Sequence, residues 1–168
     1  FRQRHIGFIF QSFNLMPYYT ALENVALPLS FRGVPRTARM KQAAKMLKLV
    51  GLDTHMQHKP GELSGGQQQR VGIARALVTN PEIVFADEPT GNLDSNTSDE
   101  VMHVIIDLLR EQHKTLVMVT HDAHIAGFGD KIISLLDGRI TDIQVNQQHP
   151  EKTKNEPDVQ ETEVKKDA

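Results

Sequence analysis

The five residues from Leu63 to Gln67, with the sequence LSGGQ, constrain this chain more than any other part of it. Their two glycines leave out side chains, so the backbone can approach an anion closely. Ser64 adds a hydroxyl, and the residues that follow predict a helix from about Gly66 to Val78. A helix N-terminus carries free N–H groups and the positive end of a dipole, which favour phosphate. Ser-Gly-Gly alone is also common at an ordinary helix start, so the residues downstream decide between the two interpretations.

Polar motifs follow two apolar runs downstream. Ile83–Ala86 is a continuous apolar run, typical of a parallel strand covered on both faces, and Asp87 and Glu88 follow it directly. The sequence Gly-Asn-Leu-Asp, ending at Asp94, comes next, and His121 follows a second apolar run. Acidic residues at the carboxyl end of a parallel strand lie where open α/β sheets bind ligands. Taken singly, the two acids also fit a solvated strand end, and the histidine fits an ordinary surface position.

Alternating strand and helix patterns predict an α/β fold with a largely parallel sheet. In chain order, the expected elements are a strand over His5–Phe10, helices over Thr20–Leu27 and Arg36–Val50, the helix after Leu63, a strand over Ile83–Ala86, a helix that begins at Thr97, a strand over Leu116–Val119 and a hairpin over Lys131–Ile143. Thr20 and Thr97 each open a capping box, with Glu23 and Glu100 three residues on. Pro28 is expected to kink or end its helix.

Composition narrows the class of protein. The 168 residues fit one domain, and a formal charge of −2 argues against a nucleic-acid-binding protein, which would carry a basic patch. The chain has no cysteine, which excludes a disulfide framework and a cysteine metal site. No apolar run is long enough to span a membrane. Work at a membrane would therefore require another subunit to hold the protein there.

The two ends of the chain differ in character from its centre. Phe1 leads almost at once into a predicted buried strand, so we expect the start to be cut from a longer domain. From Asn146 onward the large apolar residues nearly disappear, which predicts a disordered charged tail over residues 146–168. The folded domain is accordingly expected over residues 1–145.

Taken in order, these motifs resemble those of the ATP-binding subunit of ABC transporters, and the resemblance runs from Phe1 to about Ile143. It implies a P-loop NTPase-like sheet flanked by helices, with a helical subdomain over about residues 12–64. It also implies ATP and Mg²⁺ as ligands, and a head-to-tail dimer with each ATP between two subunits. The other implied partner is a transmembrane permease, which places the protein peripherally at the cytoplasmic face of the cell membrane.

The resemblance assigns roles residue by residue. Glu88 polarises the attacking water, and His121 contacts the γ-phosphate and helps to position that water. Asp87 and Gln11 hold Mg²⁺. The residues assigned to the nucleotide, or to the dimer interface around it, are Gln11, Leu63, Ser64, Gly65, Gly66, Gln67 and Asp94. Phe13–Tyr19 lies where the permease docks, although a core role for some of its apolar side chains is at least as well supported.

Two features depart from a simple assignment. The family's Walker A loop, G-x-x-x-x-G-K-[ST], is absent, because no glycine in these 168 residues is followed by lysine. That loop supplies the backbone cradle and the lysine for the β- and γ-phosphates, so we expect this chain alone to be inactive.

Two histidine pairs, His55 with His58 and His121 with His124, also suggest a metal. For the first pair a solvated loop is the better explanation, and the second lacks an evident third ligand.

Three functions fit the resemblance. The leading one is an ATPase subunit that powers export or release of a substrate, as in macrolide exporters and lipoprotein-releasing complexes, through a separate permease. The second is an FtsE-like mechanotransmitting ATPase of a cell-division or cell-wall complex. The third is a non-catalytic partner that completes another subunit's ATP site, against which the presence of Glu88 and His121 argues.

Overall fold

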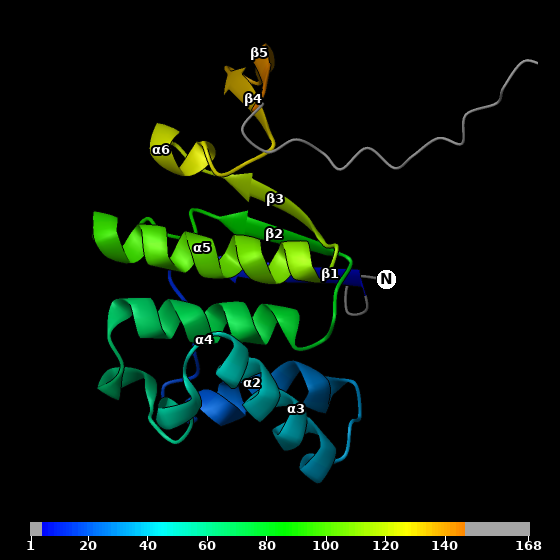
Figure 1. The fold of residues 1–168 in the computed structure, drawn as a ribbon. Helices are drawn as coiled ribbons and strands as arrows, with labels where there is room; N and C mark the ends of the chain where they lie inside the picture. The colour runs from blue at the N-terminus through cyan, green and yellow to red at the C-terminus, as the bar shows by residue number, and fades with distance from the viewer. Residues whose placement is uncertain (1–4, 147–168) are drawn as a thin grey trace, which may run out of the picture. The chain divides into compact units, whose positions relative to one another are not determined.

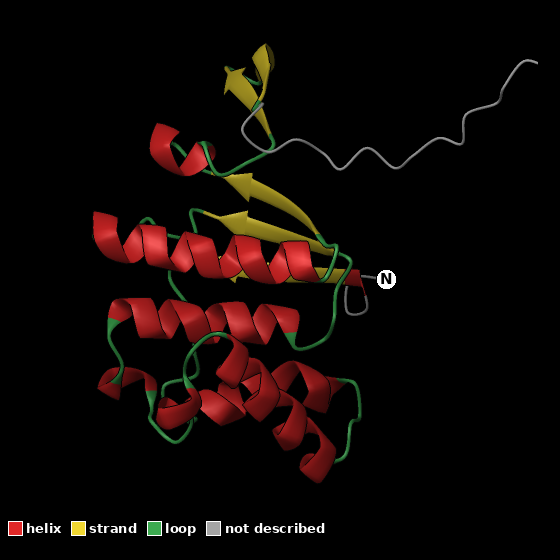
Figure 2. Cartoon of the chain, viewed as in Figure 1, coloured by secondary structure: helices red, strands yellow, loops and turns green. Residues whose placement is uncertain are grey.

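A computed structural model describes residues 5–146 of the chain, which divide into two compact units after Gly129. The first unit combines strands and helices, and the second is a β-hairpin (Figures 1 and 2). The elements of the first unit are β1 (Ile6–Phe10), α2 (Ala21–Phe31), α3 (Arg36–Leu49), the 3₁₀ turns η1 (Asp53–His55) and η2 (Pro60–Glu62), α4 (Gly65–Leu77), β2 (Ile83–Asp87), α5 (Ser95–Glu111), β3 (Thr115–Val119) and α6 (Ala123–Ala126). The hairpin consists of β4 (Lys131–Leu136) and β5 (Arg139–Val145), which pair antiparallel.

The three strands of the first unit form a parallel sheet in the order β1-β2-β3, which confirms the predicted fold class. Phe10, Asp87 and Val119 lie opposite one another at the carboxyl end of the sheet. The residue after each strand therefore leaves the sheet at the same edge. This edge is where open α/β sheets bind their ligands.

One face of the sheet packs against α4 and α5, while α2 and α3 lie on the far side of α4 (Figure 1). Ile9, Val84 and Ala86 point into this core and are at most 2% exposed. As predicted, α4 is buried around most of its circumference, and its buried apolar residues are Val71, Ile73, Ala74, Ala76 and Leu77. Burial of apolar surface on this scale is the main source of stability in such a unit.

The other face of the sheet is exposed, so the expectation that Ile83–Ala86 is covered on both faces was wrong for the described residues. Phe85 is 37% exposed and Phe8 is 42% exposed, and their rings stack at 5.7 Å. Val117 and Val119 continue the same apolar surface. The physical reason is that α4 and α5, the long helices against the sheet, both lie on its opposite face.

Two helix boundaries also differ from expectation. Pro28 lies inside α2 and does not end it, because buried side chains on either side, including Val25 and Leu29, hold the helix in place. α5 begins at Ser95 with Asp94 as its N-cap, two residues before the predicted start at Thr97. Asp94 acts as the N-cap because its carboxylate accepts a hydrogen bond from the backbone N–H of Thr97.

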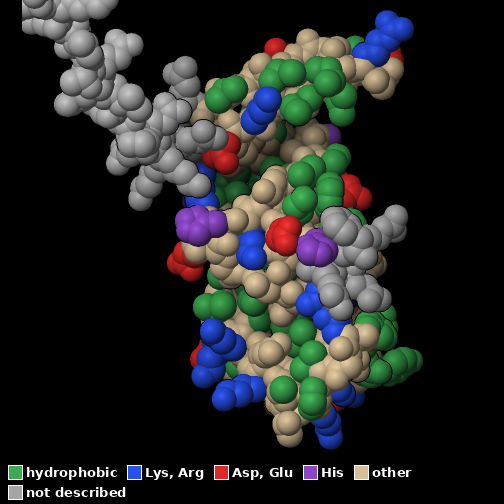
Figure 3. Space-filling view, turned by 90° about the vertical axis from the view of Figure 1, so that its right-hand side faces the viewer, with side chains coloured by type: hydrophobic (Ala, Val, Ile, Leu, Met, Phe, Trp, Pro, Cys, Tyr) green, Lys and Arg blue, Asp and Glu red, His purple; other side chains and the backbone are tan. Residues whose placement is uncertain are grey.

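The block between the first two strands is helical, as the resemblance implied. α3 buries Ala43 and Leu47 and carries basic residues without an acidic one. Lys and Arg side chains are accordingly seen on the lower part of the molecule, where α2 and α3 lie (Figure 3). The assignments of a helical subdomain over about residues 12–64 and of a domain over residues 1–145 stay predictions. Nearly all of the expected tail lies outside the described residues.

Replacement by threonine is expected to have different effects on the two faces of β2. Val84→Thr places a hydroxyl in the core and is expected to lower the free energy of unfolding by about 1–3 kcal/mol. Phe85→Thr removes exposed apolar surface, so it should change that free energy little and should reduce self-association of the chain. Urea unfolding and sedimentation velocity measure both effects. An equal loss of stability in the two variants would show that the Phe85 face is covered.

Candidate functional site

Glu88 and His121, 33 residues apart, are in direct contact at the carboxyl edge of the sheet. The His121 ring Nδ1 lies 2.6 Å from Glu88 Oε1, and the His121 backbone N–H donates to the same oxygen at 3.0 Å. The Thr120 hydroxyl donates to the other carboxylate oxygen at 3.3 Å. The Glu88 side chain is 20% exposed and that of His121 is 84% exposed. The carboxylate is thus held from one side, while the ring faces solvent.

The backbone at Glu88 fixes the direction of its carboxylate. Its φ of 45° lies in the left-handed region, which non-glycine residues seldom adopt and which often marks a functional site. The Glu88 N–H donates to Val119 O at 2.9 Å, and the Glu88 carbonyl accepts from Gly91 N at 3.1 Å. These bonds tie the turn after β2 to the end of β3.

The negative charge of Glu88 changes the pKa of its partner, His121. The hydrogen bond and the charge of Glu88, followed by the charge of Asp122, raise the pKa of His121 above its ordinary value. His121 therefore keeps its proton to a higher pH than a free histidine does. This pairing stabilises the folded state below the unfolded-state pKa of the histidine, and the contribution is lost as the pH rises through the folded-state pKa.

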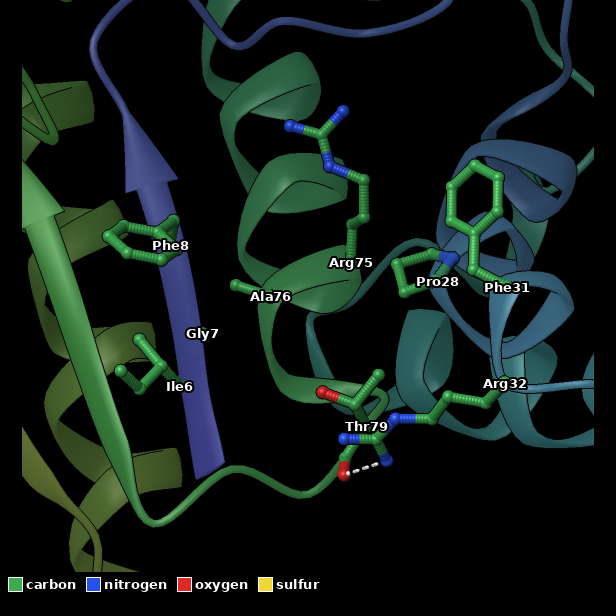
Figure 4. A pocket seen from close by; sticks show the side chains of 9 residues that line it. All are labelled: Ile6, Gly7, Phe8, Pro28, Phe31, Arg32, Arg75, Ala76 and Thr79. Atoms are coloured by element: carbon green, nitrogen blue, oxygen red, sulfur yellow. Dashed lines mark hydrogen bonds between the residues drawn. The ribbon is translucent and has the colours of Figure 1, made fainter. Parts of the chain in front are cut away.

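A cavity of about 450 Å³ opens beside this contact and is lined by Glu88, Thr120, His121 and residues of α5 and α6. A second hollow, of about 200 Å³, lies between β1, α2 and α4 (Figure 4). It contains none of the predicted site residues, and its one drawn hydrogen bond joins Arg32 to the Thr79 carbonyl at 2.9 Å. The first cavity is therefore the candidate site.

Asp87 and Gln11 leave neighbouring strands at this same edge but point to different surroundings. Asp87 is exposed and lies on the same face of β2 as Phe85. Gln11 is half-buried and packs on Gly91, where a Cβ would come within 2.6 Å of its amide nitrogen. The Gln11 carbonyl accepts from the Asn92 side chain at 3.0 Å. The register brings both residues to the sheet edge, while Gln11 itself rests against the turn that follows Glu88.

The helix start at Ser64 is built as an exposed capping box. Ser64 Oγ accepts from Gln67 N at 3.3 Å, and Gln67 Oε1 accepts from Ser64 N at 3.0 Å. Leu63 is buried just before it. At Gly66 a Cβ would meet the Thr97 methyl group at 2.5 Å, so this glycine permits close packing of α4 on α5. Gly65 faces Leu93 with less crowding, at 3.2 Å. The sequence-based explanation, approach of an anion, missed this packing role of Gly66.

Two polar residues of α4, the buried Gln69 and the half-buried Arg75, connect this helix to other site segments, and periodicity alone did not single them out. Gln69, which is 0% exposed, donates to the Pro89 carbonyl directly after Glu88. Arg75 donates to the carbonyls of Phe13 and Asn14, both of which have a positive φ. Burial lowers the pKa of Arg75. A polar residue on a helix with apolar residues around most of its circumference was the signal available in the sequence.

The loop after Gln11 divides into buried and exposed apolar residues. Phe13 and Leu15 are half-buried, whereas Met16, Tyr18 and Tyr19 are exposed. The buried amide of Asn24 fixes the end of this loop, because its side chain donates to the carbonyls of Met16, Tyr19 and Thr20 and accepts from Met16 N. The exposed part is therefore presented on a well-ordered turn.

The remaining candidates have structural partners. Asp94 is exposed, and its bonds to Thr97 lower the pKa of its carboxyl. His55 and His58 are half-buried with ring centroids 5.1 Å apart, so the solvated-loop expectation was wrong: their segment packs against α2. No group of three or more histidine and acidic side chains able to hold a metal occurs within residues 5–146. His124 instead bonds to Asp99 at 2.7 Å.

Comparisons with known proteins agree with this arrangement. The ABC transporter family profile matches residues 1–91. The lipoprotein-releasing system ATP-binding protein LolD of Syntrophotalea carbinolica is 51% identical over 141 residues, which cover 84% of this chain and 62% of LolD. The macrolide export ATP-binding/permease protein MacB of Aggregatibacter actinomycetemcomitans is 50% identical over 139 residues, 83% of this chain and 21% of MacB.

A solved structure matches as well. It is the dimeric post-hydrolysis state of the ATP-binding cassette MJ0796 of Methanocaldococcus jannaschii, bound to ADP and Pi. The TM-score is 0.76 at 48% identity, over 87% of this chain and 65% of that chain. The chain spans about three fifths of the length of the first curated relatives that it matches.

The packing role of Gly66 predicts a loss of stability that needs no ligand. Gly66→Ala should lower the free energy of unfolding by about 1–3 kcal/mol, because the new methyl group overpacks the contact with Thr97. Gly61→Ala is the matched control, since a Cβ at Gly61 meets nothing within 4 Å. Urea unfolding of both variants measures the difference. Equal stability of the two would exclude close packing as the reason for Gly66.

The Glu88–His121 contact predicts a change in a titration curve. In Glu88→Gln the carboxylate charge is lost, so the pKa of His121 should fall towards its ordinary value. The pKa of His124, which Asp99 raises, should stay unchanged. Two-dimensional NMR of the imidazole groups across the pH range follows both residues at once. An unmoved His121 would mean that the two side chains are not in contact in solution.

Proposed function

The chain belongs to the ABC transporter family, and from that premise we propose that it supplies one face of a composite ATP site in a transport ATPase. The observation that carries the proposal is the contact between Glu88 and His121. It places a carboxylate and a histidine together at the ligand-binding edge of a parallel sheet. The same contact argues against a non-catalytic partner, because such a subunit does not need a positioned general base.

Glu88 is proposed as the general base of hydrolysis. Its carboxylate, 20% exposed and directed by the turn after β2, accepts a proton from the attacking water. His121 and Thr120 hold the two oxygens in place until the water arrives. The exposed His121 ring is then available to a phosphate oxygen on its outer side. These residues position and activate the water, which suits phosphoryl transfer, a reaction governed by positioning and electrostatics.

Mg²⁺ fits the donors at the sheet edge. Asp87 is exposed there, and Gln11 follows the neighbouring strand at the same level. Carboxylate and amide oxygens suit this hard cation, which is usually held by one or two protein ligands together with phosphates and water. Residues 5–146 contain no metal cluster that would hold it without such additional ligands. When bound, Mg²⁺ neutralises charge on the phosphates.

A second ATP-binding subunit completes the site. Ser64 is exposed at the start of α4, whose N–H groups and dipole favour the γ-phosphate of an ATP held by the other subunit. Asp94 is exposed directly before α5 and is proposed to cross the same interface. The family's Walker A lysine has no counterpart in these residues. MJ0796 is dimeric in two of the solved structures that match this chain, which supports a dimer here as well.

A membrane permease is the proposed second partner. Met16, Tyr18 and Tyr19 present apolar surface on an ordered turn next to Gln11, which suits docking of a partner segment. Within residues 5–146 no helix has the length and apolar character needed to cross a membrane. The proposed location is the cytoplasmic face of the membrane, where the permease holds the protein. The names of LolD and MacB support export or release of a substrate as the work that is done.

An engineered fusion tests the proposed base. It places a Walker A segment from a family member before Phe1, and we call it the Walker A fusion. Glu88→Gln in this fusion should lower the hydrolysis rate by about 10²–10⁴-fold, the usual contribution of a general base, while nucleotide binding is kept. Gel filtration with ATP and Mg²⁺ should then show a stable dimer. A wild-type hydrolysis rate in Glu88→Gln would contradict the role of Glu88.

Two controls separate binding from chemistry. Adding Ser64→Arg to the Glu88→Gln fusion should abolish the ATP-dependent dimer, because the long side chain fills the phosphate position. Gly61→Ala leaves every proposed contact in place and should behave as the parent fusion does. Calorimetry should detect no micromolar ATP affinity in the 168-residue chain alone, because several phosphate contacts worth roughly 1.5–3 kcal/mol each are missing.

A further inference from the structure

The short helix α6 follows His121 almost directly and is tied to α5 by one side-chain pair. His124 Nε2 lies 2.7 Å from Asp99 Oδ1. The two side chains are 66% and 45% exposed. A pair this exposed contributes little to folding, so overall stability is a poor explanation for it. Its place in the fold offers a better one.

A hydrogen-bonded path leads from this pair back to Glu88. The His124 backbone N–H donates to Asp122 Oδ1 at 2.8 Å, and the Asp122 N–H donates to Thr120 Oγ1 at 3.1 Å. Thr120 Oγ1 in turn donates to Glu88 Oε2 at 3.3 Å. Residues 120–124 are therefore held at one end by Glu88 and at the other by Asp99. His121 lies between these two anchors.

Besides this pair, one core side chain, an N-cap and a ring contact fix α6. It contains four residues, of which only Ile125 is buried. A helix this short gains little from its own hydrogen bonds and depends on contacts at its ends. The other groups near His124 are Asp122, whose carboxylate caps α6, and Phe128, whose ring meets His124 edge-on at 5.8 Å and His103 of α5 at 5.3 Å. Asp99 is thus the acidic partner that α5 offers to His124.

We propose that His124 is a positioning residue for hydrolysis: through Asp99 it holds residues 120–124 on α5 and so keeps His121 against Glu88. The inference rests on the proposed roles of Glu88 and His121. In this role His124 acts through the segment that carries His121. The hydrogen bond to Asp99 and the charges of Asp99 and Asp122 raise the pKa of His124, which favours its charged, pairing form.

NMR titration of His121 in the full 168-residue chain tests the proposal, because the two possible effects of His124→Ala have opposite signs. Removing a nearby positive charge would by itself raise the pKa of His121. Loosening its contact with Glu88 would lower it. We expect a net fall. An unchanged or raised value overturns the proposal, whatever the fate of the proposed ATPase activity, since this measurement involves no nucleotide.

Two further variants sharpen the result. His124→Gln keeps an N–H donor for Asp99 without the charge, so the pKa of His121 should stay raised. His5→Ala is the matched control, because His5 forms a similar exposed pair with Glu82 at 2.9 Å, and it should leave His121 unchanged. A fall in all three variants would indicate a general loss of structure and would overturn the specific role of His124.

Activity gives an independent readout. In the Walker A fusion, His124→Ala should lower kcat by about tenfold, because a displaced catalytic group costs rate even when binding is intact. KM for ATP should change little, and His124→Gln should restore most of kcat. A rise in KM at unchanged kcat would place His124 in nucleotide binding and overturn a positioning role. If Glu88→Gln leaves hydrolysis unchanged, the proposed function fails, while the titration still decides whether His124 positions His121.

Discussion

The parallel register of three short strands is the constraint on which the rest of the first unit depends. Because the strands end at the same level, Gln11, Glu88 and Thr120 leave the sheet at one edge, although they come from distant parts of the chain. Slippage of β2 by one residue would turn Asp87 towards the helix-covered face and Ala86 towards solvent. The contact of Glu88 with His121 follows from this register and from the bond between Glu88 N and Val119 O.

α4 joins the separate parts of the candidate site into one rigid element. Its first turn presents Ser64, its middle holds the turn after Glu88 through Gln69, and its last turns hold the loop after Gln11 through Arg75. Burial around most of the helix makes these links stiff, because close-packed interiors transmit displacements and do not absorb them. A shift of the loop that carries Tyr18 and Tyr19 would therefore reach the Ser64 end of α4 by way of packed contacts.

Sequence patterns predicted the elements that can be recognised from local apolar residues alone. The apolar runs gave the parallel strands, and the apolar spread around α4 gave its burial. What the patterns missed depends on contacts between distant residues: the clash that excludes a side chain at Gly66, the capping of α5 by Asp94, and the pairing of His124 with Asp99. Pro28 does not end its helix, because tertiary packing outweighed its local penalty. The order of motifs predicted a set of site residues, whereas only the structure shows that Glu88 touches His121.

A mixing experiment tests the composite site most directly. The Walker A fusion with Ser64→Arg retains a phosphate cradle but lacks a working helix start, whereas the 168-residue chain has the helix start without the cradle. Each should be inactive alone, and the mixture should hydrolyse ATP, because one complete site forms between the two. If the mixture stays inactive while the unmodified fusion hydrolyses ATP and circular dichroism shows the 168-residue chain to be folded, this chain does not supply the opposite face of an ATP site.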